Sequence, residues 1–222
     1  MRTRAGLVTV ALSALVASGC GSNLKANYAK YDATKKVAIV GVCQLEDNPV
    51  ARGTNSTRVN VGSDLVDALA KGFDQALPNA WSGVQVIPLQ QVSTNTALPR
   101  REVFKRRRCA GGMDPFLPKG YTGDADRAYM SSLAKQLGVD AVIAISSDIG
   151  LRFSGETVRF MAGSFNPVYV HVVDKDGEQI VWVSMKGLDS AEVPVTKDAH
   201  QAAGMSYGQV VAKEFVQRMA NR

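Results

Sequence analysis

The sequence has little of several residue types that would point to a particular protein class. Only three of its 222 residues are cysteine and two are histidine, and 7% are aromatic. Three cysteines are too few for a disulfide scaffold, and neither histidine has a metal-ligand spacing such as H-E-x-x-H. The sequence contains only one long apolar run, whereas a polytopic membrane protein needs several. With 45% hydrophobic and 21% charged residues, the chain suits one globular domain.

The long apolar run lies at the N-terminus, in residues 1–20, MRTRAGLVTVALSALVASGC. Two arginines precede an uncharged stretch that is short for a membrane span but typical of a secretory signal peptide. The segment Ala17-Ser18-Gly19-Cys20 resembles the lipobox of bacterial lipoproteins. The resemblance implies that residues 1–19 are removed and that Cys20 receives acyl chains such as palmitate. By the enterobacterial sorting rule, Asp directly after the lipidated cysteine signals retention in the inner membrane. This chain has Gly21 at that position, which implies the outer membrane.

Residues 20–36 are small and polar, which predicts a lipidated, flexible tether, and residues 37–222 are expected to form the periplasmic domain. With Cys20 lipidated, Cys43 and Cys109 remain. The oxidising periplasm permits a disulfide between them. The alternative is that Cys43, at the end of an apolar run, is a small buried hydrophobic residue.

The hydrophobic pattern predicts an α/β (α+β) fold in a single domain, a mixed β-sheet flanked by helices in the order β-α-β-α-β-β-β-α. The expected strands are 37–43, 84–89, 141–145, 168–172 and 180–183, and the expected helices are 63–78, 124–137 and 196–219. Pro78 is expected to end the first helix and Gly138 to cap the second. Residues 93–122 have no sustained periodicity and are expected to be a long basic loop.

Two stretches of this pattern are similar to a known group of proteins. LAKQLGVDAVIAISSDIG (133–150) and VYVHVVDKDGEQIVWVS (168–184) contain a helix ending in L-G-x-D and a hairpin with D-x-x-G-E at its tip. They resemble the superfamily joining the curli-secretion lipoprotein, the lipoprotein B activator of penicillin-binding proteins and the N-terminal domain of TolB. The resemblance implies a periplasmic adaptor or assembly domain rather than chemistry.

The residue types used in catalysis and metal binding do not form a catalytic or metal-binding constellation in this sequence. Gly204-Met205-Ser206-Tyr207-Gly208 matches G-x-S-x-G, but it lies inside an expected helix and no His follows it. His171 and His200 stand alone, and the segment with Asp174, Asp176 and Glu178 departs from the EF-hand spacing and predicts a hairpin turn. The sequence therefore predicts no enzyme, no cofactor and no metal site.

The compositional anomaly is a cluster of basic residues in the expected long loop. It consists of Arg100, Arg101, Lys105, Arg106, Arg107 and Arg108. Such a cluster attracts an anionic lipid, an envelope polymer or an acidic protein face, while the alternative is a solvated loop without a partner. An exported protein is not expected to meet nucleic acid.

These observations predict a lipid-anchored outer-membrane lipoprotein with its domain in the periplasm. Its expected role is a non-catalytic adaptor or assembly module of a cell-envelope complex, such as peptidoglycan synthesis or secretion machinery. A subunit of a curli-type oligomeric secretion channel is the alternative, although 151–165 allows only about six or seven residues per hairpin arm, where a spanning strand needs about 9–11. The sequence leaves the envelope partner and any homo-oligomer open.

Overall fold

The structure of the protein is a computed structural model in which 23–45, 63–101, 107–115, 123–147, 150–162, 167–190, 192–194 and 197–221 are described. The expected signal peptide, Cys20, Lys105 and Arg106 lie outside the described residues. None of the described helices is both long enough and apolar enough to cross a membrane.

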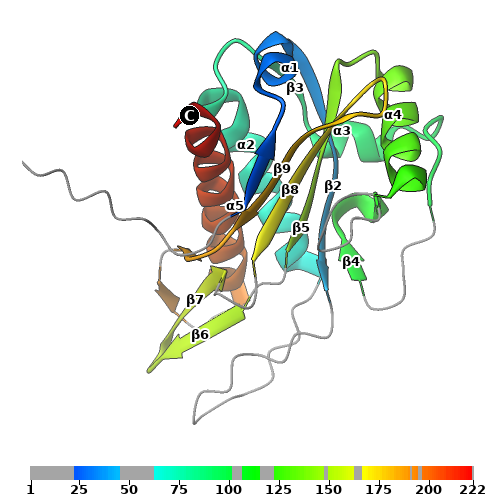
Figure 1. The fold of residues 1–222 in the computed structure, drawn as a ribbon. Helices are drawn as coiled ribbons and strands as arrows, with labels where there is room; N and C mark the ends of the chain where they lie inside the picture. The colour runs from blue at the N-terminus through cyan, green and yellow to red at the C-terminus, as the bar shows by residue number, and fades with distance from the viewer. Residues whose placement is uncertain are drawn as a thin grey trace, which may run out of the picture.

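A seven-stranded mixed sheet forms the centre of the domain (Figure 1). Its strands are β1 Leu24–Ala26, β2 Lys36–Leu45, β3 Gln85–Ile87, β4 Arg107–Cys109, β5 Ala141–Ser147, β8 Val168–Asp174 and β9 Gln179–Met185. They lie in the order β1-β9-β8-β5-β2-β3. The short strands β3 and β4 both pair with β2, β3 near its start and β4 near its end. β2 is parallel to β5 and β3, while β5, β8, β9 and β1 pair antiparallel. The mixed sheet expected from the sequence is confirmed.

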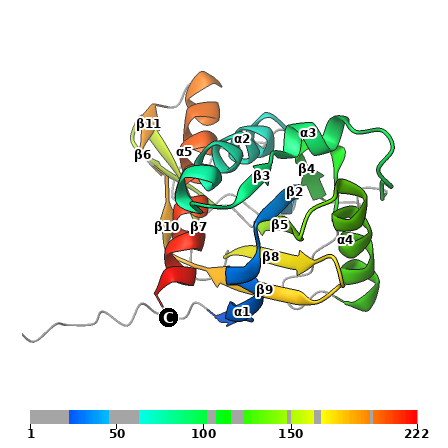
Figure 2. The same cartoon turned by 90° about the horizontal axis from the view of Figure 1, so that it is seen from above.

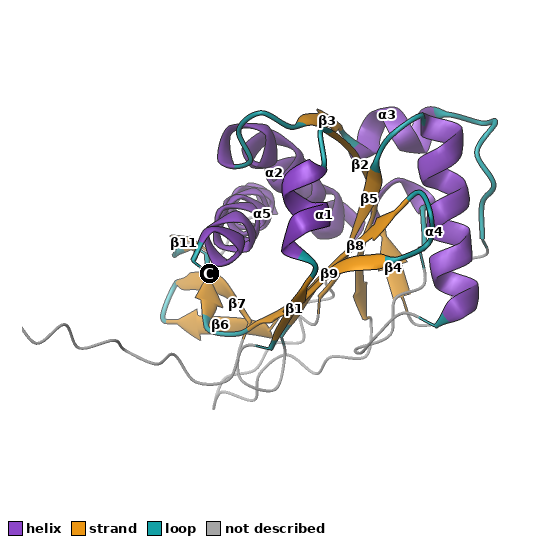
Figure 3. Cartoon of the chain, turned by 45° about the horizontal axis from the view of Figure 1, so that its top comes forward, coloured by secondary structure: helices purple, strands orange, loops and turns teal. Residues whose placement is uncertain are grey.

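The central strands are buried on both faces because helices cover both. The helices are α1 Tyr28–Ala33, α2 Ser63–Ala80, α3 Leu89–Thr94, α4 Asp124–Leu137 and α5 Lys197–Ala220, with the 3₁₀ turn η1 Ala110–Gly112. α2 and α5 lie side by side on one face, and α4 covers the other (Figures 2 and 3). This explains why β2 and β5 read as continuous apolar runs instead of alternating ones.

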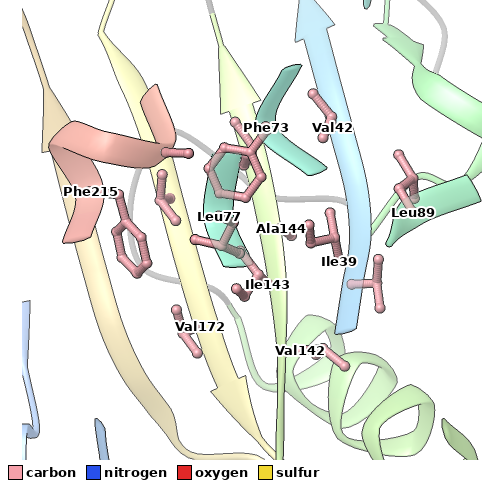
Figure 4. Close-up of a cluster of buried hydrophobic side chains, with 14 of the residues drawn as sticks. Ile39, Val42, Phe73, Leu77, Leu89, Val142, Ile143, Ala144, Val172 and Phe215 are labelled. Carbon is pink, nitrogen blue, oxygen red and sulfur yellow. The ribbon is translucent and has the colours of Figure 1, made fainter. Parts of the chain in front are cut away.

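The main core lies between the sheet and the α2–α5 pair. Phe73 and Leu77 of α2 and Phe215 of α5 project onto the sheet beside Ile143 and Val172 (Figure 4). All five side chains are fully buried.

The two long helices approach closely at glycines. A Cβ atom at Gly72 would lie 2.0 Å from the carbonyl oxygen of Met205, and one at Gly208 would lie 2.1 Å from that of Leu69. A Cβ at Gly204 would meet Leu65 at 2.7 Å. The segment that matches G-x-S-x-G is therefore a helix-packing motif, which is the structural alternative to a nucleophile elbow.

A second, four-stranded sheet lies beside the first. It contains β6 Gly150–Ser154, β7 Thr157–Ala162, β10 Leu188–Asp189 and β11 Val193–Pro194. The hairpin β6–β7 projects from the rest of the domain (Figure 1).

The segment expected to be a tether is structured from Leu24 onwards. β1 pairs with β9, and α1 follows it at once. The ring of Tyr31 stacks on Trp81 at a centroid distance of 4.4 Å and meets the edge of Phe215 at 6.4 Å. These contacts fix a six-residue helix that is too short to be stable alone. The flexible-tether prediction is therefore wrong for residues 24–36.

Two further predictions need correction. The expected loop 93–122 contains β4 and η1 among its described residues, because pairing with β2 makes a strand out of a polar sequence. Pro78 does not end α2, which continues to Ala80. A proline in the last turn removes only one helical hydrogen bond, and the N–H of Trp81 still donates to the carbonyl oxygen of Leu77. Gly138 caps α4 with φ +61°, as expected.

Candidate functional site

The two ends of the central sheet differ and need separate names. The carboxyl end is the end at which β2 and β5 finish, at Leu45 and Ser147. The amino end is the end at which these strands begin, and it includes the β8–β9 turn from Asp174 to Gly177.

The described part of the basic cluster lies partly at the carboxyl end. In β4, Arg107 pairs with Leu45 and Arg108 pairs with Gln44, the last two residues of β2. Arg108 is half-buried. The last two members of the cluster are therefore part of the sheet.

Arg101, expected to dock a partner, is held by the domain itself. Its Nη1 lies 2.7 Å from Oδ1 of Asp126, and its Nη2 donates to the carbonyl oxygen of Ala125 at 2.7 Å. The guanidinium also lies 4.3 Å from the ring centroid of Tyr129. Burial raises the pKa of Tyr129, whose hydroxyl donates to the carbonyl oxygen of Pro99. Arg101 thus pins the chain onto α4, and Arg100 likewise donates to the carbonyl oxygen of Ser93.

Cys43 and Cys109 face each other directly across β2 and β4. Their Sγ atoms lie 2.11 Å apart, a disulfide, and their Cα atoms lie 4.1 Å apart. Oδ1 of the buried Asp114 lies 3.8 Å from Sγ of Cys43. The two sulfurs and this carboxylate lie within 4.8 Å of one another. Bonded to each other, however, the sulfurs offer no thiolate to a metal ion.

The residues considered for catalysis are placed apart. His171 is fully buried in β8, with Nδ1 2.9 Å from Nε2 of Gln179. Ser206 lies within α5, in the close-packed segment described above. His200 also lies in α5, and only its backbone is described. The described residues do not bring a nucleophile, a base and a stabilising donor together.

At the amino end, an ionic cluster that was not predicted from the sequence ties α1 to the β8–β9 turn. Nζ of Lys30 lies 2.7 Å from Oδ2 of Asp174 and 2.6 Å from Oε2 of Glu178. Oδ1 of Asp174 also accepts the N–H groups of Asp176 and Glu178, at 3.0 and 2.8 Å. Hydrogen bonds to Asp174 and then Glu178 raise the pKa of Lys30, and the hydrogen bond from Lys30 lowers the pKa of Glu178.

Beside this cluster, a groove of about 420 Å³ runs between α4 and the turn. It is lined by Asp124, Arg127, Ala128, Ser131, Ser132, Lys135, Asp176 and Gly177. Charges of both signs and two hydroxyl groups line it, a composition suited to a polar segment of another protein. The D-x-D-G-E sequence signalled the turn, but no sequence signal marks the groove.

The pKa of one half-buried carboxyl group is raised. Both carboxylate oxygens of Asp74, in α2, lie 3.1 Å from the backbone nitrogen of Leu89 at the start of α3. Burial raises the pKa of Asp74 to about 6, against the opposing effect of the N–H groups of Leu89 and Gln90. Asp74 therefore serves to join α3 to α2.

No family model and no curated protein matches the sequence. Solved structures that it resembles include lipoprotein GNA1162 from Neisseria meningitidis, with 16% identity, a TM-score of 0.37, and coverage of 85% of this chain and 99% of that chain. A PelC dodecamer from Paraburkholderia phytofirmans shows 10% identity and a TM-score of 0.36, covering 87% and 96%. The LpoB C-terminal domain from Salmonella enterica shows 14% identity and a TM-score of 0.31, and the match covers 72% of this chain and 83% of that chain.

Proposed function

We propose that this chain is a lipid-anchored outer-membrane lipoprotein whose domain acts as a non-catalytic periplasmic adaptor or assembly module of a cell-envelope complex. The observation that carries the proposal is the sequence Ala17-Ser18-Gly19-Cys20 after an apolar signal, directly ahead of the folded domain. Several acyl chains on one cysteine would anchor the protein essentially permanently, since each buried CH₂ contributes about 0.8 kcal/mol.

The non-catalytic role is supported by how the polar groups are used. Arg101, Lys30 and Asp174 are engaged in holding elements of the domain to one another. His171 is enclosed within the sheet and its helix layer rather than lining the groove at the amino end. The groove offers charged and hydroxyl side chains for binding, without the arrangement that acyl or phosphoryl transfer needs.

The groove supports an envelope protein as the partner. Arg127, Ser132 and Lys135 lie along α4 at intervals that place them on one side of the helix. A partner segment lying along α4 could pair with these groups and with Asp176 across the groove. Binding here would leave the disulfide and the basic strand β4 untouched, because they lie at the other end of the sheet.

A crosslinking pull-down from intact envelopes tests the proposal. We expect the wild-type protein to capture one envelope protein, and the double variant Arg127→Ser, Lys135→Ser to lose it. The double variant Arg107→Ser, Arg108→Ser carries the same change in charge at the other end and is expected to retain the partner. Cys20→Ser should release the protein from the membrane fraction.

Other outcomes of this experiment would change the conclusion. Wild-type protein that captures chiefly copies of itself in a large ring would favour the curli-type channel. A Cys20→Ser variant that stays membrane-bound would contradict the lipid anchor. Capture that survives both double variants would place the partner on another surface.

A further inference from the structure

The disulfide between Cys43 and Cys109 has a buried carboxylate beside it. Oδ1 of Asp114 lies 3.8 Å from Sγ of Cys43, and the two sulfurs and the carboxylate lie within 4.8 Å of one another. Asp114 is 1% exposed and Cys43 is fully buried, whereas Cys109 is half-buried. Moving a carboxylate out of water is costly unless a proton donor or a cation faces it. The sulfur of a disulfide provides neither to the oxygen that faces it.

Glycines bring this carboxylate back to the sulfurs. After β4 the chain reverses through η1, where Gly111 and Gly112 have φ +62° and +65°, a conformation that glycine adopts without strain. On β2, a Cβ atom at Gly41 would lie 2.4 Å from Cδ of Pro115. The segment that carries Asp114 therefore packs directly on the backbone of β2. The arrangement comes from strand register and a turn, and no ligand spacing in the sequence marks it.

The three ligand atoms fit a tetrahedral zinc ion once the sulfurs are reduced. Zn–S bonds of about 2.3 Å and Zn–O bonds of about 2.0–2.2 Å place neighbouring ligand atoms of such a site about 3.6–3.8 Å apart. Oδ1 of Asp114 is already 3.8 Å from Sγ of Cys43. Only the two sulfurs have to separate to a similar distance, and rotation about the Cα–Cβ bond of the half-buried Cys109 supplies that movement.

The types of ligand determine which ions this site would hold. Thiolates favour soft and borderline ions such as Zn²⁺ over Mg²⁺ and Ca²⁺, which bind oxygen ligands. Three protein ligands leave the fourth position of a tetrahedral ion to water. Two thiolates and one carboxylate carry three negative charges, of which Zn²⁺ neutralises two. Binding to the two thiols and the ionised carboxylate releases two protons.

We propose that Cys43, Cys109 and Asp114 form a Zn²⁺ site in the reduced chain, and that the disulfide and the bound ion are alternative states of the same two sulfurs. The chain is synthesised with free thiols, so the ion binds before oxidation or after a dithiol reductant has opened the disulfide. Zinc replaces two thiol protons without electron transfer. When a disulfide oxidant takes two electrons from the thiolates, it becomes a dithiol, the S–S bond of the chain forms and the ion leaves.

This inference goes beyond the proposed function and does not depend on the lipid anchor. In the reduced chain the ion would hold β4 on β2, as the covalent bond does in the oxidised chain. We therefore expect Zn²⁺ to raise the urea midpoint of the reduced protein and to leave that of the oxidised protein unchanged, because an ion stabilises only the state that binds it.

Cobalt(II) binding to the reduced protein tests the site directly. Residues 20–222 with Cys20→Ser are reduced with a phosphine, freed of reductant and titrated with Co²⁺ in the absence of oxygen. We expect one ion per chain, with a thiolate-to-cobalt charge-transfer band and the visible bands of a tetrahedral ion, both removed by equimolar Zn²⁺. The oxidised protein and the variant Cys43→Ala, Cys109→Ala should show neither set of bands.

A matched pair of variants tests the carboxylate. Asp114→Asn should weaken Zn²⁺ binding by about 100-fold or more, since loss of a partner that merely orients a ligand already costs about 10–100-fold. Asp176→Asn, with the same change in charge at an exposed position, should leave the affinity unchanged. The wild-type protein gives a readout that needs no substitution. Zn²⁺, but not Mg²⁺, should slow alkylation of both Cys43 and Cys109 by at least about tenfold.

The outcomes that would overturn the inference are distinct from those that concern the proposed function. Reduced wild-type protein without the charge-transfer band, or with thiols that are alkylated at an unchanged rate in Zn²⁺, would overturn it. Affinity that is unchanged by Asp114→Asn would contradict the three-ligand site. Partner capture and membrane anchoring are measured with other residues, so failure of the zinc site leaves the proposed function standing, and the reverse also holds.

Discussion

The two ends of the central sheet differ in whether their polar groups have hydrogen-bond partners within the domain. At the amino end, Oδ2 of Asp140 accepts the N–H groups of Lys35 and Lys36 at 3.0 Å each, and Asp174 accepts two backbone N–H groups and the ammonium of Lys30. At the carboxyl end, the side chains of Gln44 and Ser147 are 4% and 2% exposed. Oε1 of Gln44 and Oγ of Ser147 have no hydrogen-bond partner among the described residues.

This difference separates an end whose polar groups are paired within the domain from an end where two buried polar atoms have no partner among the described residues. A buried polar atom without a partner costs about 1–3 kcal/mol, so alanine or valine would serve the core better at these positions. The amino end is self-contained in the sense that its polar side chains bond to the turns and the helix at that same end. The carboxyl end instead retains two buried polar atoms that have no partner among the described residues.

The largest expected effect concerns the Cys43–Cys109 bond, which is the strong element of the carboxyl end. The bond closes a loop with a sequence separation of 66 residues. Loop-closure entropy for that length predicts about 4 kcal/mol, so Cys43→Ala, Cys109→Ala should lower the free energy of unfolding by about 2–4 kcal/mol. Urea unfolding of residues 20–222 with Cys20→Ser measures the difference.

Reduction supplies the control for this prediction. A phosphine reductant should destabilise the protein that contains Cys43 and Cys109 and leave the double-alanine variant unchanged. Mass spectrometry without reductant should find the peptides of β2 and β4 joined. Equal stability with and without reductant would mean that pairing with β2, rather than the covalent bond, holds β4 in place.

Long periodic elements of this fold could be predicted from the sequence. The apolar run in 37–43 predicts a strand covered on both faces, and β2 is an interior strand between β5 and the short strands β3 and β4. Leu137-Gly138 ends α4 because glycine adopts the left-handed conformation without strain. The hairpin of β8 and β9 follows from alternating apolar residues around a D-x-D-G turn.

Short and polar elements could not be predicted, because tertiary contacts make them. β1 has three residues and α1 has six, too few for a periodic signal. β4 has the sequence Arg-Arg-Cys and becomes a strand only through its pairing with β2. The ion pair of Lys30 with Asp174 joins two residues that are 144 positions apart in the sequence.

The next effect in size concerns the self-contained amino end. Asp174→Ala removes the acceptor for the N–H groups of Asp176 and Glu178 and one of the two partners of Lys30. The loss of these charge-assisted bonds should lower the free energy of unfolding by about 2–3 kcal/mol. Urea unfolding at pH 7 measures it. Asp176→Ala, at an exposed position of the same turn, should change it by less than about 0.5 kcal/mol.

The pH dependence of this cluster has a defined sign. The lowered pKa of Glu178 contributes stability above its ordinary value of 4.5, and this is lost as the pH falls through the lowered value. The raised pKa of Lys30 contributes stability that is fully present below 10.5, so it stays constant across neutral pH. The cost of Glu178→Gln should therefore be steady from about pH 6 to pH 9 and shrink in acid. A cost that grows in acid would mean that the cluster is not ionised as described.

The smallest effect compares one substitution at the two ends. Oγ of Ser131, facing the amino-end turn, donates to the carbonyl oxygen of Lys175 at 2.6 Å, so Ser131→Ala should cost about 1 kcal/mol. Ser147→Ala removes a buried hydroxyl that has no described partner, so it should be neutral or stabilise the domain by up to about 1 kcal/mol. Paired urea-unfolding curves measure this opposite sign directly. If Ser147→Ala costs as much as Ser131→Ala, the hydroxyl has a partner inside the folded domain, and the carboxyl end is as self-contained as the amino end.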